Sequence, residues 1–549
     1  MGQSTNQQQT VPGVRIDVSQ LRGTTRFNDL HDDLQKQIKL FDDVIQQQIR
    51  LKNDCDAIMP AHNNQLAQVP HDVEFVRRKR IGVENAQDSD AQAISIVQKL
   101  IKVDAEHAKL SFKAIDNLKL PPQYHSTGVW SGNPAANDNR NQENGDADAQ
   151  DIVSFFKYEK GDINPLPDIE YALGWGVSQT GRFLRHFLYQ GFNEDESGRQ
   201  VFDGVFDQVG GAGRGSFNHR FGQASRDALQ HFNFLFPVDM FPFADTTLTD
   251  PLTGVTDGLL RRASDSDTVP KVFHLLTNSE YFNRAGSLIH TDPTGVRDVA
   301  PPDTSRIYMV ASGPHIVGRF PPAQNPSTSF LGQAPMNPLI YAAVVRALFD
   351  ALDAWVVGDQ APPPSRYPQL SDKTLTPPAE TGWPEGTGAR LPQSPLAALR
   401  LDFGPDWSLG IVSNEPPLIG DPFVQLVPAV DENGNDRAGI RLPEIEVPLA
   451  TQTGWNYRHA SIGAADRLSS EIGSYFPFAQ TASERRQNND ARLSIAERYR
   501  DKNDYLGRIT EAALALVEER YLLAADLPEV IQRAGNHYDW AIAETTTRR

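Results

Sequence analysis

Ser178 lies in a segment whose neighbours suit a reactive serine. In GWGVSQTGR, residues 174–182, an apolar strand-like run leads into Gly176 and Ser178 and then into a helical pattern. A sharp strand-to-helix turn exposes the serine oxygen, and small residues leave room for it. The helix start would offer the backbone N–H of Gln179 to a developing oxyanion. The usual Gly-x-Ser-x-Gly spacing is extended by one residue, and serines between glycines also occur in ordinary loops.

A nucleophilic serine needs a base, and the base needs an acid that orients it. Glu280 follows the apolar run VFHLLT, and His315 follows the next such run, RIYMVAS. The chain order serine, acid, histidine is the order found in α/β-hydrolases. A single loop histidine is more often a structural or surface residue, but the ordered series favours catalysis. We therefore predict Ser178, Glu280 and His315 as catalytic residues acting on a small ester-like substrate.

Four other polar residues near these apolar runs are candidates for the substrate pocket, for packing or for the orienting acid. His290 and Asp292, in LIHTDPTG, are predicted to line the substrate pocket. His274 lies inside an apolar run and is expected to be a packed histidine. Asp239, in PVDMFPF, is a weaker alternative for the acid.

Two loops resemble ligand-binding loops in composition. Residues 210–221, GGAGRGSFNHRF, lack the Lys-Ser/Thr of a phosphate-binding P-loop, so we expect a substrate-side loop at a strand end. Residues 431–436, DENGND, space acidic residues as a calcium loop does, but the required Gly and Glu are missing. A hairpin turn is the expected structure there. We predict no metal and no cofactor.

The composition excludes several classes of protein. The 549 residues carry a formal net charge of −18, which argues against non-specific binding to nucleic acid or to an anionic membrane. Cys55 is the only cysteine, so an intrachain disulfide and a cysteine-based zinc site are excluded. The polar first residues show no signal-peptide pattern, and no apolar run is long enough to span a membrane. We expect neither nucleic acid nor membrane as a partner.

After residue 150, apolar runs typical of buried strands alternate with helical patterns. Strands are predicted at 171–177, 272–277 and 306–312, and helices at 182–192 and 338–358. This alternation predicts a parallel α/β sheet. A β-hairpin is expected over 423–450 and a closing helical segment over 504–534.

The chain before residue 150 follows a different pattern. Residues 1–22 are polar and Gln-rich, and are expected to be a disordered tail. Over residues 23–120, apolar residues recur at steps of three and four, first at Leu34, Ile38, Phe41 and Ile45, and again from Ile94 to Ile115. Such stripes predict coiled-coil helices, with an amphipathic helix on a globular core as the alternative. Residues 121–150 are rich in Asn, Asp, Gly and Ala and are predicted to be a flexible linker, which places a domain boundary near 150.

Long stretches after residue 150 carry a resemblance to a known family. They include DIVSFFKYEKGDINPLPDIEYALGWGVSQTGRFLRHFLYQGFNEDESGRQVFDGV, NSEYFNRAGSLIHTD and AGIRLPEIEVPLATQTGWNYR. Through them, residues 151–545 resemble uncharacterised α/β-hydrolase-domain proteins. The resemblance implies a serine-hydrolase fold in which Ser178, Glu280 and His315 occupy triad-like positions. It implies no particular substrate.

Two stretches before residue 150 resemble a different family. They are VPGVRIDVSQLRGTTRFNDLHDDLQKQIKLFDDVIQQQI and the segment from VPHDVEFVRRKR to LKLPPQYH. Through them, residues 10–150 resemble the coiled-coil region of fungal central-channel FG nucleoporins. The resemblance implies that residues 23–120 assemble with two other channel nucleoporins. The Phe-Gly repeats of that family do not occur in residues 1–20. The two resemblances meet near residue 150. An engineered chimera, a gene-model error or a natural gene fusion would each produce such a junction.

Together these features predict an incomplete α/β-hydrolase-like sheet, preceded by an all-α coiled-coil segment and a disordered linker. In the hydrolase family, a long segment before the serine would supply the early strands and a second oxyanion donor. The nucleoporin-like segment stands in its place, so we expect a hydrolase-like module with little or no activity. The alternatives are a competent esterase, or a structural component of the nuclear pore central channel whose hydrolase half is inert. The expected location is the nuclear pore or nuclear envelope if the N-terminal resemblance governs, and the cytoplasm otherwise.

Overall fold

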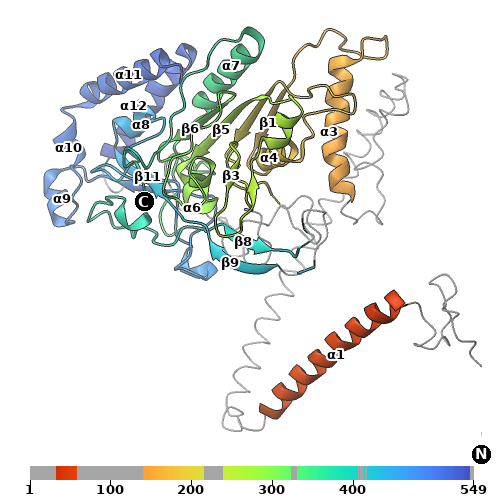
Figure 1. Ribbon diagram of the computed structural model, residues 1–549. Helices are drawn as coiled ribbons and strands as arrows, with labels where there is room; N and C mark the ends of the chain where they lie inside the picture. The colour runs from red at the N-terminus through yellow and green to blue at the C-terminus, as the bar shows by residue number, and fades with distance from the viewer. Residues whose placement is uncertain are drawn as a thin grey trace, which may run out of the picture. The chain divides into compact units, whose positions relative to one another are not determined.

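The computed structural model describes residues 32–58, 140–215, 239–322, 331–405, 407, 413–414 and 417–543 (Figure 1). The chain divides into two compact units, Met1–Asn117 and Leu118–Arg549, and each is described by itself. Over the described ranges, no helix combines the length and the apolar character needed to cross a membrane.

In the first unit, α1 (Asp32–Ile58) carries the first predicted apolar stripe. Ile38, Phe41 and Ile45 are 42, 70 and 54% exposed on it. Steps of three and four place these side chains on one helix face, as in a helix of a coiled coil. The second stripe and the tail over residues 1–22 lie outside the described residues, so the coiled coil stays a prediction.

The second unit is built on four parallel strands in the order β1-β2-β5-β6. The strands are β1 (Leu173–Val177), β2 (Gly204–Gln208), β5 (Lys271–Thr277) and β6 (Ser305–Val310). This parallel sheet with its helices confirms the predicted α/β class. β2 was not predicted from the sequence because Asp207 interrupts its apolar run, although the Asp207 side chain is buried against His274.

The remaining elements surround this sheet or extend it. The helices are α3 (Arg140–Tyr158), α4 (Gln179–Gln190), α5 (Arg261–Asp265), α6 (Asn278–Asn283), α7 (Ala342–Gly358), α8 (Pro443–Glu446), α9 (Ala482–Gln487), α10 (Ile495–Arg498), α11 (Lys502–Glu518) and α12 (Leu527–Ile542). The two-stranded sheets pair β3 (Leu248–Thr249) with β4 (Thr256–Asp257), β7 (Leu375–Thr376) with β10 (Val427–Pro428), β8 (Leu399–Asp402) with β9 (Leu418–Pro422), and β11 (Ala450–Thr453) with β12 (Ser474–Pro477).

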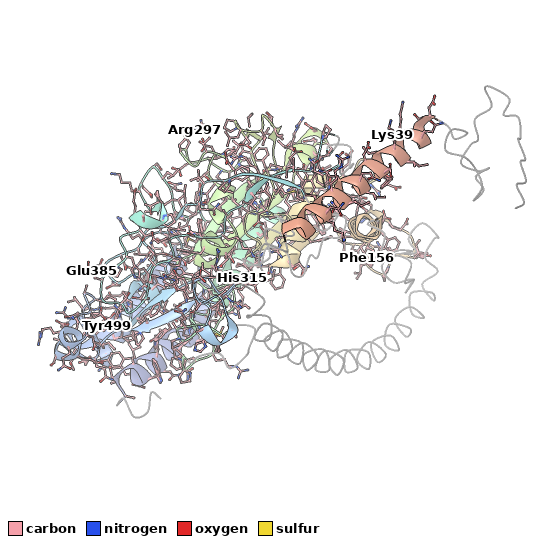
Figure 2. The ribbon with its side chains drawn as sticks, turned by 90° about the horizontal axis from the view of Figure 1, so that it is seen from below. Lys39, Phe156, Arg297, His315, Glu385 and Tyr499 are labelled. Atoms are coloured by element: carbon pink, nitrogen blue, oxygen red, sulfur yellow. The ribbon has the colours of Figure 1, made fainter. Side chains whose placement is uncertain are left out.

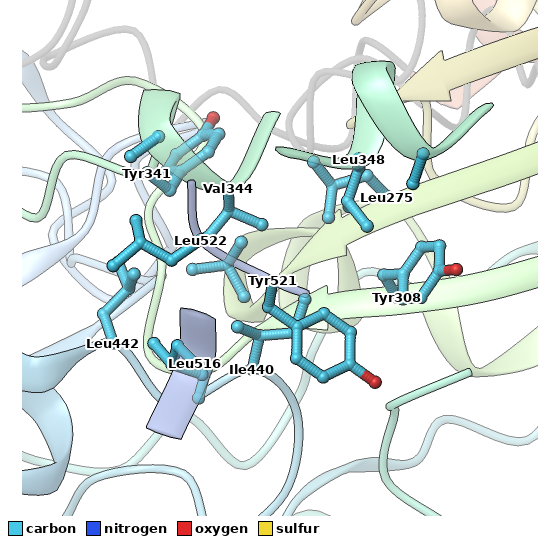
Figure 3. Close-up of a cluster of buried hydrophobic side chains, with 14 of the residues drawn as sticks. Leu275, Tyr308, Tyr341, Val344, Leu348, Ile440, Leu442, Leu516, Tyr521 and Leu522 are labelled. Carbon is cyan, nitrogen blue, oxygen red and sulfur yellow. The ribbon is translucent and has the colours of Figure 1, made fainter. Parts of the chain in front are cut away.

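Consecutive residues of the central strands pack into cores on opposite faces of the sheet, as the two-residue period of a strand requires. Val205 and Val272 pack against α4 in one core. Phe206 and Phe273 lie in the other core, together with Leu348 of α7. Figure 3 shows part of this second core, where side chains from α7, β6 and α11 converge. The sheet is therefore covered on both faces and can hold loops firmly at its edge.

β1, the strand that leads to Ser178, lies at one side of the sheet. Within the described residues it pairs with β2 alone. Trp175 and Val177 on this strand are 54 and 40% exposed. A strand edge with exposed apolar side chains is suited to pairing with a further strand, which fits the incomplete sheet that the resemblance implies.

α3 begins inside the segment for which a flexible linker was predicted, so the linker prediction is wrong for residues 140–150. Phe155 on α3 is buried, and Lys157 Nζ lies 2.7 Å from a carboxylate oxygen of Asp203. These contacts anchor the second half of α3 beside β2, and the helix continues back to Arg140. The earlier part of the predicted linker lies outside the described residues.

The β-hairpin predicted over 423–450 is also wrong. A bridge between Val430 and Asp436 closes the turn at its centre, but β10 pairs with β7 instead of a hairpin partner. Ile440 bridges Val310 of β6 and enters the main core. Burial of Ile440 outweighs local strand pairing, and Pro443 has no N–H to continue a ladder.

Candidate active site

The backbone at Ser178 is held in a conformation that few L-residues adopt. Its φ and ψ are 57° and −113°, between the end of β1 and the start of α4. A Cβ on Gly176 would lie 2.4 Å from the carbonyl oxygen of Thr180, so this turn requires glycine there. Thr180 Oγ1 accepts from the N–H of Val177 at 2.7 Å and donates to its carbonyl at 2.8 Å. The turn thus presents Ser178 at the carboxyl edge of the sheet.

Ser178, His315 and Glu280 form one continuous chain of hydrogen bonds. His315 Nε2 lies 2.9 Å from Ser178 Oγ, and His315 Nδ1 lies 2.7 Å from Glu280 Oε1. The side chains of His315 and Glu280 are 7 and 0% exposed. His315 is labelled in Figure 2. Residues from three separate strand ends therefore meet in the geometry that a general base and its orienting acid need.

Thr277 fixes the carboxylate of Glu280. Its backbone N–H and its Oγ1 both donate to Glu280 Oε2, each at 2.6 Å, as part of a capping box at the start of α6. Oε1 is thereby left for His315 Nδ1. This division of the two oxygens orients the imidazole with Nε2 toward Ser178. Thr277 was not among the predicted site residues, although the Thr-x-x-Glu spacing of a capping box is a recognisable sequence pattern.

The peptide group that joins His315 to Ile316 is held as well. The N–H of Ile316 donates to the carbonyl of Glu471 at 2.8 Å. Tyr341 Oη donates to the carbonyl of His315 at 3.3 Å. These contacts fix the backbone of the histidine loop directly after His315.

Gln179 is the first residue of α4. The first N–H groups of a helix have no acceptor within the helix, and the helix dipole favours negative charge at this end. The position is therefore suitable for the oxyanion donor that the sequence predicts.

His290 and Asp292, predicted to line the substrate pocket, have internal partners. His290 is fully buried, with Nε2 2.8 Å from Tyr281 Oη, and burial lowers its pKa to about 4. Asp292 is 4% exposed and accepts from Arg297 Nε at 3.2 Å. Neither contributes a hydrogen bond to the chain that joins Ser178 to Glu280. Their contacts stabilise the segment after α6, and substrate binding by these two residues stays a prediction.

His274 is buried in β5, where the sequence placed a packed histidine, and it faces two carboxylates. Nδ1 lies 3.1 Å from Asp207 Oδ2, and Nε2 lies 3.0 Å from Asp245 Oδ1. Burial by itself lowers the pKa of His274, but Asp245 and Asp207 outweigh burial and the opposing charge of Arg185, and raise the pKa to about 9. His274 is thus a buried imidazolium that ties β5 to its neighbours.

This cluster makes stability depend on pH. The pKa of His274 rises from an unfolded value of 6.5 to about 9 on folding, so its stabilisation is complete below the first value and lost as the pH passes the second. We expect the free energy of unfolding to fall between about pH 7 and pH 9. Urea denaturation across this range measures the slope, and His274→Gln should flatten it. An unchanged slope in that variant contradicts the assignment.

Asp239, the weaker alternative acid, is not the partner of His315. It is 5% exposed, and burial raises its pKa although Arg284 and Arg182 oppose the shift. Glu280 holds the position beside His315 Nδ1 instead.

The two loops that resemble ligand-binding loops in composition lie after β2 and in a tight turn. Residues 210–215 follow β2, and the N–H of Ser178 donates to the carbonyl of Gln208 at 2.8 Å, so this loop starts at the same sheet edge as the serine. Residues 216–221 lie outside the described ranges. In the 431–436 segment, the N–H of Asp431 donates to the carbonyl of Asn435 at 2.8 Å, which closes a tight turn. Across the described ranges, no three His, Cys, Asp or Glu side chains are grouped closely enough to hold a metal ion.

Comparisons with known proteins support both halves of the sequence interpretation. A family model described as alpha/beta hydrolase domain matches residues 90–532. Nucleoporin NUP49 of Chaetomium thermophilum is 53% identical over 162 residues, which cover 28% of this chain and 34% of that protein. The chain thus spans about a third of the length of this curated relative. No solved structure matches the chain. Because the family model spans well over half of the residues, the chain belongs to the alpha/beta hydrolase domain family.

Proposed function

We propose that the chain is a serine hydrolase of the esterase type, with Ser178 as nucleophile, His315 as base and Glu280 as orienting acid. The observation that carries the proposal is the unbroken hydrogen-bond chain through these three side chains, at 2.9 and 2.7 Å. The backbone N–H of Gln179 is the proposed oxyanion donor.

The proposed reaction follows from this geometry. Ser178 Oγ attacks the ester carbonyl carbon while its proton passes to His315 Nε2, and the Glu280 carboxylate stabilises the imidazolium. The tetrahedral intermediate collapses, His315 protonates the leaving alcohol, and an acyl group stays on Ser178. Water then attacks this acyl group, again giving a proton to His315. Release of the acid returns the proton to Ser178 Oγ.

We expect slow turnover. The family resemblance implies that the second oxyanion donor comes from a segment before the serine, where this chain resembles a nucleoporin. Loss of one such donor costs about 10²–10³ in rate. Small esters with good leaving groups should therefore be the best substrates, because they need the least stabilisation of the oxyanion.

Hydrolysis of a 4-nitrophenyl ester by the full chain tests the proposal. We expect a rate above the buffer background that Ser178→Ala removes. Ser197→Ala is the matched control, because Ser197 lies in an exposed loop between α4 and β2. Equal rates for the chain and for Ser178→Ala would show that the observed hydrolysis does not use this site.

A second candidate function is favoured by α1. Its exposed Ile38, Phe41 and Ile45, together with the match to Nucleoporin NUP49, support an interaction segment over residues 23–120. The proposed partners of this segment are coiled-coil segments of other nuclear pore proteins. The proposed hydrolase domain is separate from it and covers residues 151–549. The two functions use different residues, so one chain is able to have both.

Substitutions on α1 test the interaction. Phe41→Glu with Ile45→Glu should abolish a complex with partner nucleoporins, because both changes place carboxylates in the apolar stripe. Lys39→Glu with Gln46→Glu adds carboxylates away from the stripe and should leave the complex intact. Size-exclusion chromatography with light scattering distinguishes the two variants. Loss of the complex in both, or in neither, contradicts the predicted seam.

A further inference from the structure

Asp436 joins two segments that carry different members of the proposed site. Its carboxylate oxygens accept from Asn278 Nδ2 at 2.8 and 2.9 Å, and Oδ2 also accepts from the N–H of Ser312 at 2.5 Å. In return, the N–H of Asp436 donates to Ser312 Oγ at 2.9 Å. Asn278 stands two residues before Glu280, and Ser312 stands three residues before His315.

Ser312 is the bend that directs the histidine loop away from β6. Its φ is 57°, in the left-handed region that non-glycine residues rarely adopt. The two hydrogen bonds with Asp436 hold this conformation, and Asn337 Nδ2 adds a third by donating to the Ser312 carbonyl at 2.8 Å. A residue in such a strained conformation persists only where several contacts hold it there together.

The acid helix and the histidine loop also pack directly on each other. The N–H of Ser279 donates to the carbonyl of Gly313 at 3.3 Å. Gly454 lies against both segments, because a Cβ there would come within 2.1 Å of Ser279 N and 2.6 Å of the Gly313 carbonyl oxygen. The N–H of Gly454 donates to Asn278 Oδ1 at 2.7 Å. A shift of one segment therefore cannot be absorbed locally and moves the other.

We propose that Asp436 is a positioning residue of the serine site, which fixes the bend at Ser312 against Asn278 and so keeps His315 aligned between Glu280 and Ser178. Asp436 is 1% exposed, and the donors to its carboxylate are a neutral side-chain amide and a backbone N–H. A buried carboxylate with such partners is costly to keep and weak as a stabilising element. Its geometric role accounts for its presence. The inference rests on the proposed hydrolase function.

The direct readout is the proton that His315 Nδ1 shares with Glu280. Proton NMR of the full chain should show this proton as a resonance far downfield, assigned by its absence in His315→Gln. Asp436→Asn should broaden or remove the resonance. Its amide oxygen stays with the Ser312 N–H, so its NH₂ takes the place of Oδ1 and meets the Asn278 Nδ2 amide as a second donor, which pushes the two segments apart. Asp431→Asn is the matched control. It removes the carboxylate charge that pairs with Arg441 Nη2 beside the same turn, where Asp431 also accepts from the N–H groups of Asn433 and Asn435, but it keeps the Asp436 carboxylate.

Kinetics supply the second readout. Asp436→Asn should lower kcat by about 10²-fold with little change in KM, as expected for misplacement of a base by a fraction of an ångström to one ångström. Asp431→Asn should leave kcat near that of the unmodified chain. If Asp436→Asn does not fold, Ser312→Ala replaces it. This variant removes one of the two hydrogen bonds between Ser312 and Asp436, and should give a smaller fall in kcat.

The outcomes separate this inference from the proposed function. If the unmodified chain shows no turnover, but its downfield resonance is lost in Asp436→Asn and kept in Asp431→Asn, positioning holds and hydrolysis fails. If the chain is active and a folded Asp436→Asn keeps both the resonance and kcat, positioning is overturned and hydrolysis stands. Absence of the resonance in the unmodified chain overturns the inference, because His315 is then not aligned on Glu280 in solution.

Discussion

Glu280→Gln is expected to lower kcat/KM for a small ester by about 10⁴-fold. Thr277 donates two hydrogen bonds to Glu280 Oε2, so the amide oxygen of the variant stays with these donors. The amide NH₂ then faces His315 Nδ1, which must become an acceptor. The imidazole proton consequently moves to Nε2, which is no longer able to take the proton of Ser178. A conservative substitution thus places the base in the wrong tautomer.

The matched control for this prediction is Glu471→Gln. Glu471 accepts from Arg284 at 2.9 Å through its side chain, and its carbonyl accepts from Ile316 next to His315. The substitution keeps that backbone contact, so activity should stay within about tenfold of the unmodified chain. Steady-state kinetics at pH 7 to 8 compare the two variants. Equal activity for Glu280→Gln and Glu471→Gln contradicts the assignment of Glu280 as the orienting acid.

Asp245→Ala is expected to lower the free energy of unfolding by about 3–5 kcal/mol. Both oxygens of Asp245 lie 3.0 Å from Nε2 of the buried His274. Their removal leaves a buried imidazolium beside Arg185 with one remaining carboxylate, that of Asp207. Urea denaturation of the full chain at pH 7 measures the loss.

A double variant separates the charge effect from the loss of packing. Combining Asp245→Ala with His274→Leu removes both charges of the pair, and should recover part of the lost stability because no unpaired imidazolium remains. A double variant at least as unstable as Asp245→Ala would mean that packing around Asp245, and not the charge on His274, determines the loss.

The three members of the proposed triad were accessible from the sequence because each follows a local signal. Ser178 lies in a glycine-bounded turn, and Glu280 and His315 each follow an apolar run that forms a buried strand. In a parallel sheet the carboxyl ends of the strands share one edge, so chain order and strand ends were enough to group the three residues.

The supporting residues carry no such signal. Asp436 is separated by 158 residues from Asn278 and by 124 from Ser312, and its own neighbours predicted only a tight turn. β2 was missed because Asp207 is a charged residue inside a buried strand, where His274 compensates its charge. The hairpin predicted over 423–450 does not form because Ile440 pairs with β6 and enters its core. A local sequence pattern carries no information about contacts with such a distant strand.

The exposed side of β1 links the fold to the expected low activity. Trp175 and Val177 are exposed next to the serine turn, and within the described residues β1 pairs with β2 alone, so this strand edge is open to a further strand. The family resemblance implies that the segment carrying the strands next to β1 also supplies the second oxyanion donor. Weak catalysis and a tendency to associate through β1 are therefore expected together in this chain.

Labelling of Ser178 by a fluorophosphonate is the most direct test of the central claim. Phosphonylation needs an activated serine and its base, and it accumulates even where turnover is slow. Intact-mass analysis should show one adduct on the full chain and none on Ser178→Ala. An unlabelled chain that is soluble and folded, or an adduct that persists in Ser178→Ala, would contradict the proposal that Ser178, His315 and Glu280 form a working catalytic unit.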